Sequence, residues 1–370
     1  MKILILSCKT GEGHNSAAKA MEEAFKRLGA ECEIKDPVSF GGDKAKKAVS
    51  SLYNGIIKKT PKVFGAIYKI GEFYDRTELP SPVYYANSLY AKNLDEYIRN
   101  NNIDAVVCTH LYGMEAMTAI KKKFGCPVPC YGIFTDYTCI PFIGDVKMTA
   151  MFVPHDEIKQ EYIYMGYRED KVFSYGIPVS NSFNEDISRE DAREELGIDS
   201  DKKMILIMTG GVGCGKIYEL CEELKEVCKE ENMIYVMTGH NNDMKEEIDE
   251  KYRGTDNIRT VSFTHKVNLY IKSSDVLITK PGGLSSTEAA VAKVPMVQFM
   301  TIPGCETKNA DFFRKHEMAL KADSIKEAAY CAKILLCDKD TSERMKAMQK
   351  ECINENAADD IAKKIIAYER

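Results

Sequence analysis

The sequence has 370 residues, of which 44% are hydrophobic and 29% charged, and its formal net charge is −5. Single cores rarely grow beyond roughly 250–300 residues, so we expect two globular domains. The acidic balance excludes a general basic surface for nucleic acid, so an anionic partner would need a local basic patch.

The cysteines and the N-terminus indicate the cellular compartment of the protein. The 13 cysteines are scattered, with no C-x-x-C pair and no Cys/His cluster at zinc spacing, as is typical of a reducing cytoplasm. The first apolar run, Ile3–Leu6, is too short for a signal peptide. No apolar stretch approaches the ~18 residues of a membrane span. We therefore expect a cytoplasmic protein without a zinc site.

Short apolar runs alternate with helical patterns along the first half of the chain. Strands are predicted at Lys2–Ser7, Glu31–Asp36, Ile103–His110, Val128–Thr135, Thr149–Val153 and Val172–Tyr175. Helices are predicted at His14–Leu28, Tyr85–Asn100, Tyr112–Phe124 and Asp156–Met165. Continuous Val/Ile/Leu-rich runs joined by helices indicate a parallel sheet covered on both faces.

The second half repeats this alternation. Strands are predicted at Lys203–Thr209, Met233–Thr238, Ile258–Val261, Asp275–Thr279 and Val294–Met300. Helices are predicted at Lys216–Glu231, Asn242–Tyr252, Val267–Ser273, Ser285–Lys293 and Thr307–His316. The charged stretch Gly176–Ser200 between the halves resembles a linker.

The predicted fold class is therefore α/β, with two doubly wound, Rossmann-like domains facing a cleft. We place the first domain at residues 1–178 and the second at 179–345. A last helical region, 346–370, is expected to cross back onto the first domain. Ligands of such folds bind at the carboxyl ends of the strands.

The first of three glycine loops is KTGEGHNS, residues 9–16. It is an imperfect dinucleotide fingerprint, and by itself it favours a tight strand–helix turn. His14 nevertheless stands at the start of a helix, whose positive end lowers the pKa of a nearby histidine and keeps it able to accept a proton.

The second loop, GGVGCGKI, approaches a P-loop but has Ile217 where a Ser or Thr would bind magnesium. This substitution argues against a P-loop NTPase. Backbone N–H groups of such a loop can still bind a diphosphate, although a close-packed turn explains the glycines equally well.

The third loop runs from Thr279 to Glu288. Gly282 and Gly283 let a phosphate approach the N-terminus of the next helix, and Glu288 is placed to accept both hydroxyls of a ribose. Further on, Glu306 and Asn309 are three residues apart and share a helix face that can bind sugar hydroxyls. A single capped helix with a solvated polar face is the alternative, but two consecutive polar helix starts favour a ligand site.

The segment TKPGGLSSTEAAVAKVPMVQFMTIPGCETKNADFF resembles the donor-binding segment of the diacylglycerol glycosyltransferases. These include bacterial processive glucosyltransferases and plant monogalactosyldiacylglycerol synthases, and they are related to the peptidoglycan transferase MurG. GEGHNSAAKAM, TDYTCIPF and MTGGVGCGK resemble other motifs of the family in the same order. The resemblance implies a GT-B fold, a UDP-sugar as substrate with no further cofactor, a lipid acceptor, inversion at the anomeric carbon and no essential metal.

Carried over residue by residue, the resemblance makes His14 the base or the histidine that orients the acceptor, and Asp136 the acidic residue facing the cleft. The pattern departs at Cys305, where many relatives have glutamine, and near residues 139–142, where better-known members have a histidine. These departures leave the sugar and the acceptor open. The donor-binding positions that the resemblance implies are Gly211, Gly213, Thr264, Pro281, Gly282, Gly283, Glu288, Gly304, Glu306 and Asn309.

A basic, aromatic segment, residues 44–71, holds seven lysines and no acid. Its apolar residues follow helical spacing, so it can lie in an anionic membrane surface, although an ordinary amphipathic helix packed on the domain fits as well. A lipid acceptor favours the membrane and a peripheral location on the inner face of the cell membrane. The residues expected to contact acceptor or membrane are Lys47, Tyr53, Lys58, Lys59 and Phe64.

We therefore expect an inverting transferase that moves a hexose from a UDP-sugar to a lipid, with diacylglycerol as the expected acceptor. Three alternatives stay open. They are a MurG-like transferase with a polyprenyl-linked acceptor, a UDP-sugar epimerase, and a non-catalytic protein that binds nucleotide-sugars.

Overall fold

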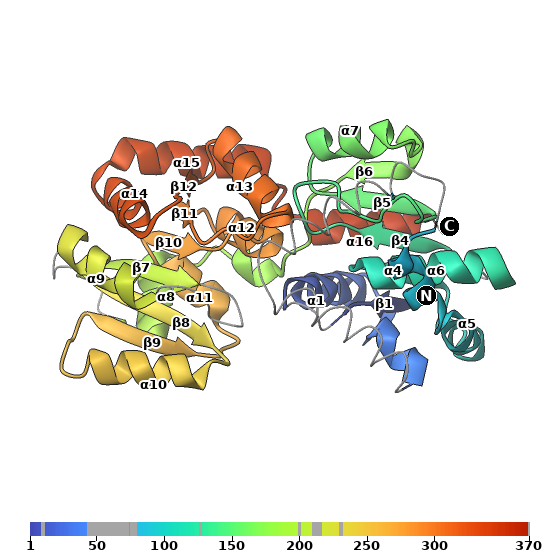
Figure 1. Cartoon of the computed structure of the whole chain (residues 1–370), viewed down its shortest axis with the longest axis horizontal. Helices are drawn as coiled ribbons and strands as arrows, with labels where there is room; N and C mark the ends of the chain where they lie inside the picture. Colours follow the sequence, from blue (N-terminus) through green and yellow to red (C-terminus); the bar gives the residue numbers. More distant parts are fainter. Residues whose placement is uncertain are drawn as a thin grey trace. The chain divides into compact units, whose positions relative to one another are not determined.

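The computed structural model describes residues 1–8, 12–42, 74, 80–125, 128–198, 201–208, 217–228 and 232–368. These residues form two compact α/β units, shown in Figure 1. The first unit comprises Met1–Ser180, Ile302–Cys305 and Asn356–Arg370, and the second comprises Asn181–Thr301 and Glu306–Glu355. Each unit contains a six-stranded sheet, so the predicted class of two doubly wound domains is confirmed.

The sheet of the first unit has the strand order β2-β1-β3-β4-β5-β6, with parallel pairing throughout. Every residue of β3, β4 and β5 is buried, as expected for a parallel sheet with helices on both faces. The strands are β1 Lys2–Leu6, β2 Glu31–Lys35, β3 Ala105–Cys108, β4 Cys130–Ile133, β5 Ala150–Val153 and β6 Val172–Ser174.

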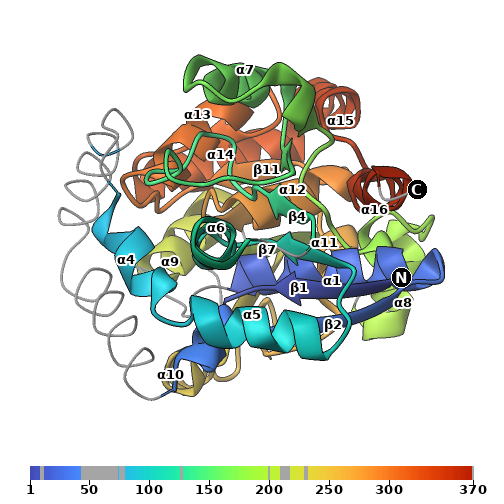
Figure 2. The same cartoon turned by 90° about the vertical axis from the view of Figure 1, so that its right-hand side faces the viewer.

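The helices of the first unit include the C-terminal one, α16, which lies beside α1 as Figure 2 shows. Arg27 of α1 and Asp359 of α16 form an ion pair of 2.6 Å at this contact. Beneath it, Met21 and Phe25 pack in one core with Ile361. The helices are α1 Glu12–Arg27, α4 Pro82–Ser88, α5 Ala91–Asn100, α6 Leu111–Phe124, α7 Asp156–Tyr164 and α16 Ala357–Tyr368, with 3-10 turns η1 Pro37–Gly41 and η2 Glu169–Lys171.

The predicted helix Tyr85–Asn100 is in fact two helices, α4 and α5. Tyr90 leaves helical geometry (φ −106°, ψ 4°) and buries its ring. Its hydroxyl donates a hydrogen bond to the buried side chain of Asn87. Burying this aromatic residue and satisfying its hydroxyl outweighs one more turn of continuous helix.

The sheet of the second unit has the order β12-β11-β10-β7-β8-β9 and is also parallel throughout. Its core joins β7 and β10 to α9 and α14, through residues such as Ile205, Ile278 and Leu224. The strands are β7 Lys203–Met208, β8 Asn232–Gly239, β9 Ile258–Ser262, β10 Val276–Thr279, β11 Met296–Gln298 and β12 Leu320–Lys321. The helices are α8 Arg189–Leu196, α9 Ile217–Cys228, α10 Asn242–Lys251, α11 Val267–Ser273, α12 Gly283–Val291, α13 Cys305–Lys315, α14 Ile325–Cys337 and α15 Lys339–Cys352, with the 3-10 turn η3 Asn181–Phe183.

The stretch predicted as a linker contains a packed helix, α8. Ser188 caps its N-terminus, and Gly197 ends it in the left-handed conformation (φ 64°). Arg193 is only 3% exposed, and it donates to the Ser273 carbonyl at 2.9 Å and pairs with Asp275 at 2.8 Å. The linker prediction was wrong because the charge of Arg193 is satisfied in the fold, which the composition of the segment does not show. Neither α14 nor β12 was predicted from the sequence.

None of the helices within the described ranges is long and apolar enough to cross a membrane.

Candidate active site

His14 lies in the first turn of α1, directly after β1, at the carboxyl edge of the first sheet. Its Nδ1 atom is 3.0 Å from the Thr109 carbonyl oxygen and 3.0 Å from Thr135 Oγ1. Because a carbonyl oxygen only accepts hydrogen bonds, we assign the hydrogen to Nδ1, which leaves the lone pair on Nε2. Thr109 follows β3 and Thr135 follows β4, so three adjacent strands hold this imidazole.

The start of α1 is fixed to the sheet by further side-chain bonds. Thr109 Oγ1 donates to the His14 carbonyl at 3.1 Å. Ser7 Oγ donates to Asn15 Oδ1 at 2.8 Å. Hydrogen bonds thus hold both the ring and the backbone of His14, which favours a fixed direction for its Nε2 atom.

The electrostatics of His14 favour the neutral ring. Burial lowers its pKa, and the negative charge of Asp136 partly opposes this effect. From the sequence we expected the helix N-terminus to lower this pKa; the direction is the same, but burial is the largest cause. Asp136 follows Thr135 in the chain and is half-buried. The structure thus brings His14 and Asp136 together at one edge of the first sheet.

His110 is a second histidine at this edge, and it was not among the site residues predicted from the sequence. Its ring centroid is 4.6 Å from that of His14, in an edge-to-face arrangement. Its Nδ1 accepts a 3.2 Å hydrogen bond from the Tyr112 N–H and caps α6. Burial lowers its pKa well below the usual value, and His14 adds to the effect. The available signal was its position at the end of the predicted strand Ile103–His110.

In the second unit, β10 leads into the loop Lys280–Gly282 and then into α12. Gly282 is the N-cap of α12, and a Cβ added to it would meet no atom within 4 Å. The first N–H groups of a helix have no partners within the helix and favour an anion. The space in front of Gly282 is therefore open beside a positive helix end, as a phosphate site requires.

Glu288, in the second turn of α12, is only 9% exposed. Burial raises its pKa to about 8. Among the residues that the structure describes, neither a hydrogen bond nor an ion pair reaches this carboxylate, and no charged neighbour contributes to its pKa. A ligand that offers two hydroxyl donors would satisfy these oxygens.

Helix α13 places Glu306 and Asn309 on one face, as the sequence predicted. Both contact the loop before α12. Glu306 Oε1 is 3.4 Å from the Lys280 ammonium, and Asn309 Nδ2 donates to the Pro281 carbonyl at 3.1 Å. These two residues therefore hold the loop, and their contact with a sugar stays a prediction.

Of the remaining predicted site residues, Thr264 and Gly304 lie within the described ranges. Thr264 follows β9 and accepts a hydrogen bond from the Lys266 N–H at 3.0 Å, and Gly304 precedes α13 with φ 120°. Next to Thr264, exposed Phe263 stacks on His240 at 4.2 Å between ring centroids, an aromatic pair that the sequence did not indicate. The predicted residues that lie outside the described ranges are Gly211, Gly213, Lys47, Tyr53, Lys58, Lys59 and Phe64.

Two family models match the chain, one in each half. The monogalactosyldiacylglycerol (MGDG) synthase model matches residues 14–179, and the glycosyltransferase family 28 C-terminal domain matches residues 204–365. Both models describe glycosyltransferases, and the chain is therefore a glycosyltransferase. His14 and Asp136 thus lie in the MGDG synthase half of this glycosyltransferase, and Glu288 lies in the family 28 half.

Curated relatives extend over almost the whole glycosyltransferase. The processive diacylglycerol beta-glucosyltransferase of Bacillus pumilus is 26% identical over 372 residues, covering 99% of this chain and 94% of the relative. The enzyme of the same name from Bacillus subtilis is 25% identical over 372 residues, with the same coverage.

Solved structures show that the fold of this glycosyltransferase is GT-B. MurG of Acinetobacter baumannii has a TM-score of 0.65 at 14% identity, covering 99% of both chains. A UDP-GlcNAc 2-epimerase of Neisseria meningitidis has a TM-score of 0.64 at 14% identity, covering 99% of this chain and all of the other. Transferases and epimerases share this architecture, so the family models, rather than the fold, identify a transferase.

Proposed function

We propose that this glycosyltransferase moves a hexose from a UDP-sugar to a hydroxyl of diacylglycerol, with inversion at the anomeric carbon. The observation that carries the proposal is the His14 imidazole, held with its hydrogen on Nδ1 and its lone pair on Nε2, in the half that matches the MGDG synthase model. A neutral, oriented imidazole is the base that a neutral hydroxyl nucleophile needs.

The transfer is a single displacement. The acceptor oxygen forms a bond to the anomeric carbon while the bond from that carbon to the phosphate oxygen breaks, and its electron pair leaves with UDP. The acceptor proton goes to His14 Nε2. Asp136 stabilises the imidazolium that results, because its charge favours the protonated ring. His110 stays neutral beside it, because burial and the nearby imidazolium both disfavour a second proton.

The departing diphosphate meets positive potential in the second unit. Gly283 begins α12, whose first N–H groups have no partner within the helix, and Lys280 adds an ammonium next to them. Glu288 accepts hydrogen bonds from the ribose hydroxyls. The exposed ring of Phe263, at the carboxyl end of β9, offers a surface on which a base can stack.

We further propose that the protein binds the inner face of the cell membrane, where its acceptor lies. In the described part of the first unit, α4 and α6 pack together and expose apolar and basic side chains. Tyr85 of α4 and Leu89, which directly follows α4, are exposed, and the last turn of α6 carries Lys121, Lys122 and Lys123. Exposed apolar side chains beside lysines favour an anionic lipid surface.

The test is UDP release from a panel of UDP-sugars, with and without vesicles that contain diacylglycerol. We expect release that depends on diacylglycerol, with a glycosylated diacylglycerol as product. UDP release that needs a polyprenyl-linked acceptor instead would contradict the proposal that diacylglycerol is the acceptor. Conversion of the sugar without UDP release would indicate an epimerase, and UDP binding without turnover in any arm would contradict catalysis.

A further inference from the structure

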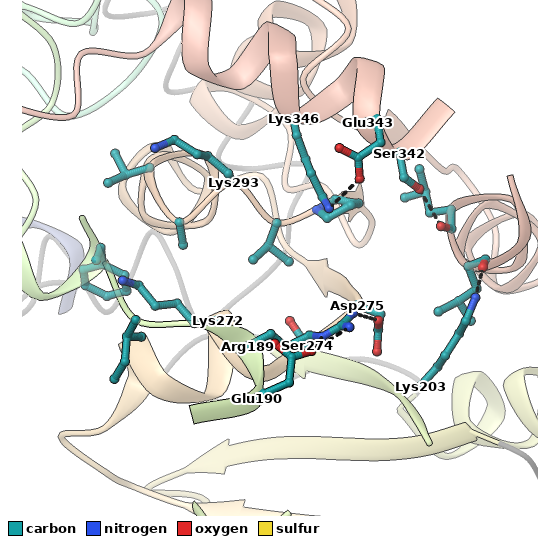
Figure 3. Close-up of a pocket in the computed structure, with 18 of the residues that line it drawn as sticks. Arg189, Glu190, Lys203, Lys272, Ser274, Asp275, Lys293, Ser342, Glu343 and Lys346 are labelled. Atoms are coloured by element: carbon teal, nitrogen blue, oxygen red, sulfur yellow. Dashed lines mark hydrogen bonds and ion pairs between the residues drawn. The ribbon is translucent and has the colours of Figure 1, made fainter. Parts of the chain in front are cut away.

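A cavity of about 790 Å³ lies at the amino edge of the second sheet, and Figure 3 shows its lining. Lys203 begins β7 there, Asp275 directly precedes β10, and Pro295 directly precedes β11. The loop with Gly282 follows the opposite, carboxyl end of β10. The cavity is therefore separate from the proposed donor site, and its volume is that of a small-molecule site.

Of the lining carboxylates, those of Asp275 and Glu343 are already paired, whereas the charges of Glu185 and Asp186 act on Lys272. Asp275 forms ion pairs with Arg189 at 2.5 Å and with Arg193 at 2.8 Å. Glu343 of α15 pairs with Lys346 at 2.9 Å. These acids are therefore not available as counter-charges for the other lysines of the cavity.

Among the described residues, two lysines of the lining have main-chain partners alone. Lys203 donates to the Leu336 carbonyl, and Lys272 donates to the Glu185 carbonyl. Lys272 is 9% exposed and makes this one hydrogen bond within the described part of the chain, so two of its three N–H donors are unused. A buried ammonium without a carboxylate partner is costly unless a ligand supplies the missing charge.

Lys293 is a second ammonium, whose charge acts on Lys272, and it forms an ion pair with Glu355 at 3.0 Å, which uses one of its three N–H donors. Burial lowers the pKa of Lys272, and Lys293 lowers it further, whereas the charges of Glu185 and Asp186 oppose the shift. In Figure 3, the Lys272 and Lys293 side chains extend toward the same side of the cavity. Lys293 lies two residues after the end of α12 and has a left-handed backbone (φ 56°), where glycine is the least strained residue.

We propose that this cavity binds a small anion that carries a phosphate group, and that its occupant regulates the donor site. A phosphate carries up to two charges and several acceptor oxygens, which suits two neighbouring ammonium groups with unused donors. Lysine binds phosphate as a point charge and needs no planar, bidentate geometry.

Helix α12 connects the cavity to the donor site. It begins at Gly283, beside the phosphate-binding loop, and carries Glu288. Its last residue, Val291, and the following Lys293 line the cavity. A ligand that binds Lys293 therefore acts on α12, the helix that carries Glu288, the carboxylate proposed to bind ribose. This regulatory step rests on the proposed function, whereas binding in the cavity does not.

The first experiment titrates the full-length protein with inorganic phosphate by calorimetry. Chloride keeps the ionic strength constant, and saturating UDP fills the donor loop. Lys272→Met keeps the length of the side chain and removes its charge. Lys326→Met, on the exposed face of α14, is the matched control. We expect the wild type and the control to bind phosphate and Lys272→Met to bind at least about tenfold more weakly, the loss of one strong charged contact.

Equal phosphate binding by Lys272→Met and the wild type would overturn the site, and so would no binding by any of the three proteins. Glycerol 3-phosphate and citrate serve as further probes. Tighter binding of glycerol 3-phosphate than of inorganic phosphate assigns the site to an organic phosphate, and the reverse order assigns it to the free ion. Equal or tighter binding of citrate overturns the phosphate class.

The second experiment measures the Kd of UDP with and without glycerol 3-phosphate. We expect a change of about fivefold or more in the wild type, the lower range of allosteric coupling, and none in Lys272→Met. Direct competition at the donor loop would persist in Lys272→Met and would contradict regulation through the cavity. If UDP does not bind at all, the proposals of a donor site and of its regulation are both wrong. The phosphate titration, repeated without UDP, still tests whether the cavity binds phosphate.

Discussion

The side-chain amide of Asn309 donates a 3.1 Å hydrogen bond to the carbonyl oxygen of Pro281. Asn309 is fully buried on α13, and Pro281 lies in the loop that precedes α12. One turn earlier on the same face, Glu306 pairs with Lys280. Helix α13 thus holds two consecutive residues of the proposed phosphate-binding loop, so the position of this loop depends on a helix later in the chain.

Replacing Asn309 by Ala should weaken UDP binding through the loop. The variant leaves the Pro281 carbonyl without this donor, and we expect the free energy of unfolding to fall by about 1–3 kcal/mol. The Kd of UDP should rise, and calorimetry together with urea unfolding measures both effects. A variant that loses stability but binds UDP like the wild type would show that the bond supports the fold alone.

Replacing His14 by Ala should reduce kcat by about 10²–10⁴-fold, the usual contribution of a general base. The Kd of UDP should not change, because His14 belongs to the first unit and the donor residues to the second. Turnover is measured with saturating diacylglycerol. Wild-type turnover in this variant would exclude the role of base.

The lowered pKa of His14 also predicts the pH dependence of activity. A base must be deprotonated, so kcat/KM should fall only below pH 6.5, the ordinary value for histidine, because burial moves the folded pKa lower. The linkage to stability has the same sign. Below pH 6.5 the unfolded chain binds a proton that the folded chain does not, so the free energy of unfolding falls. An acid limb above pH 6.5 would contradict this assignment.

The raised pKa of Glu288 predicts that UDP binds more tightly as the pH rises through about 8. Ribose hydroxyls donate to the ionised carboxylate, whose fraction grows between pH 7 and 9. The second phosphate pKa is about 6, so the charge of UDP changes little in this range. Glu288→Gln should bind UDP more weakly and show no such trend, as calorimetry across this range can measure. A flat profile in the wild type would exclude the ribose role.

Neutralising two lysines at the end of α6 should weaken binding to anionic vesicles. Each lysine near such a surface contributes about 1 kcal/mol, so Lys121→Gln combined with Lys123→Gln should cost about 2 kcal/mol in a sedimentation assay. Lys122 stays unchanged because it packs over the Tyr84 ring at 4.6 Å. Lys326→Gln with Lys333→Gln is the control, since it removes the same charge from α14. Equal losses in both double variants would indicate general attraction rather than a docking surface.

The sequence by itself determined the alternation of strands and helices and the place of the loops in it. Runs such as Ile103–His110 are apolar enough to be buried on both faces, and glycines such as Gly282 mark the loops that follow the strands. The local sequence pattern predicted structure less well where charged side chains are buried. The charged segment around Arg193 looks like a linker, yet that arginine is buried and satisfied by Ser273 and Asp275.

Only the tertiary structure decided which of these residues meet. The sheet order β2-β1-β3-β4-β5-β6 places the ends of β1, β3 and β4 side by side, so His14, His110 and Thr135 converge from distant parts of the chain. The bond from Asn309 to Pro281 likewise joins α13 to the end of β10. Parallel strands need long crossovers, and neighbours in the sheet are therefore remote in sequence. For this reason, sequence spacing located the loops of the site but not the contacts that hold its side chains.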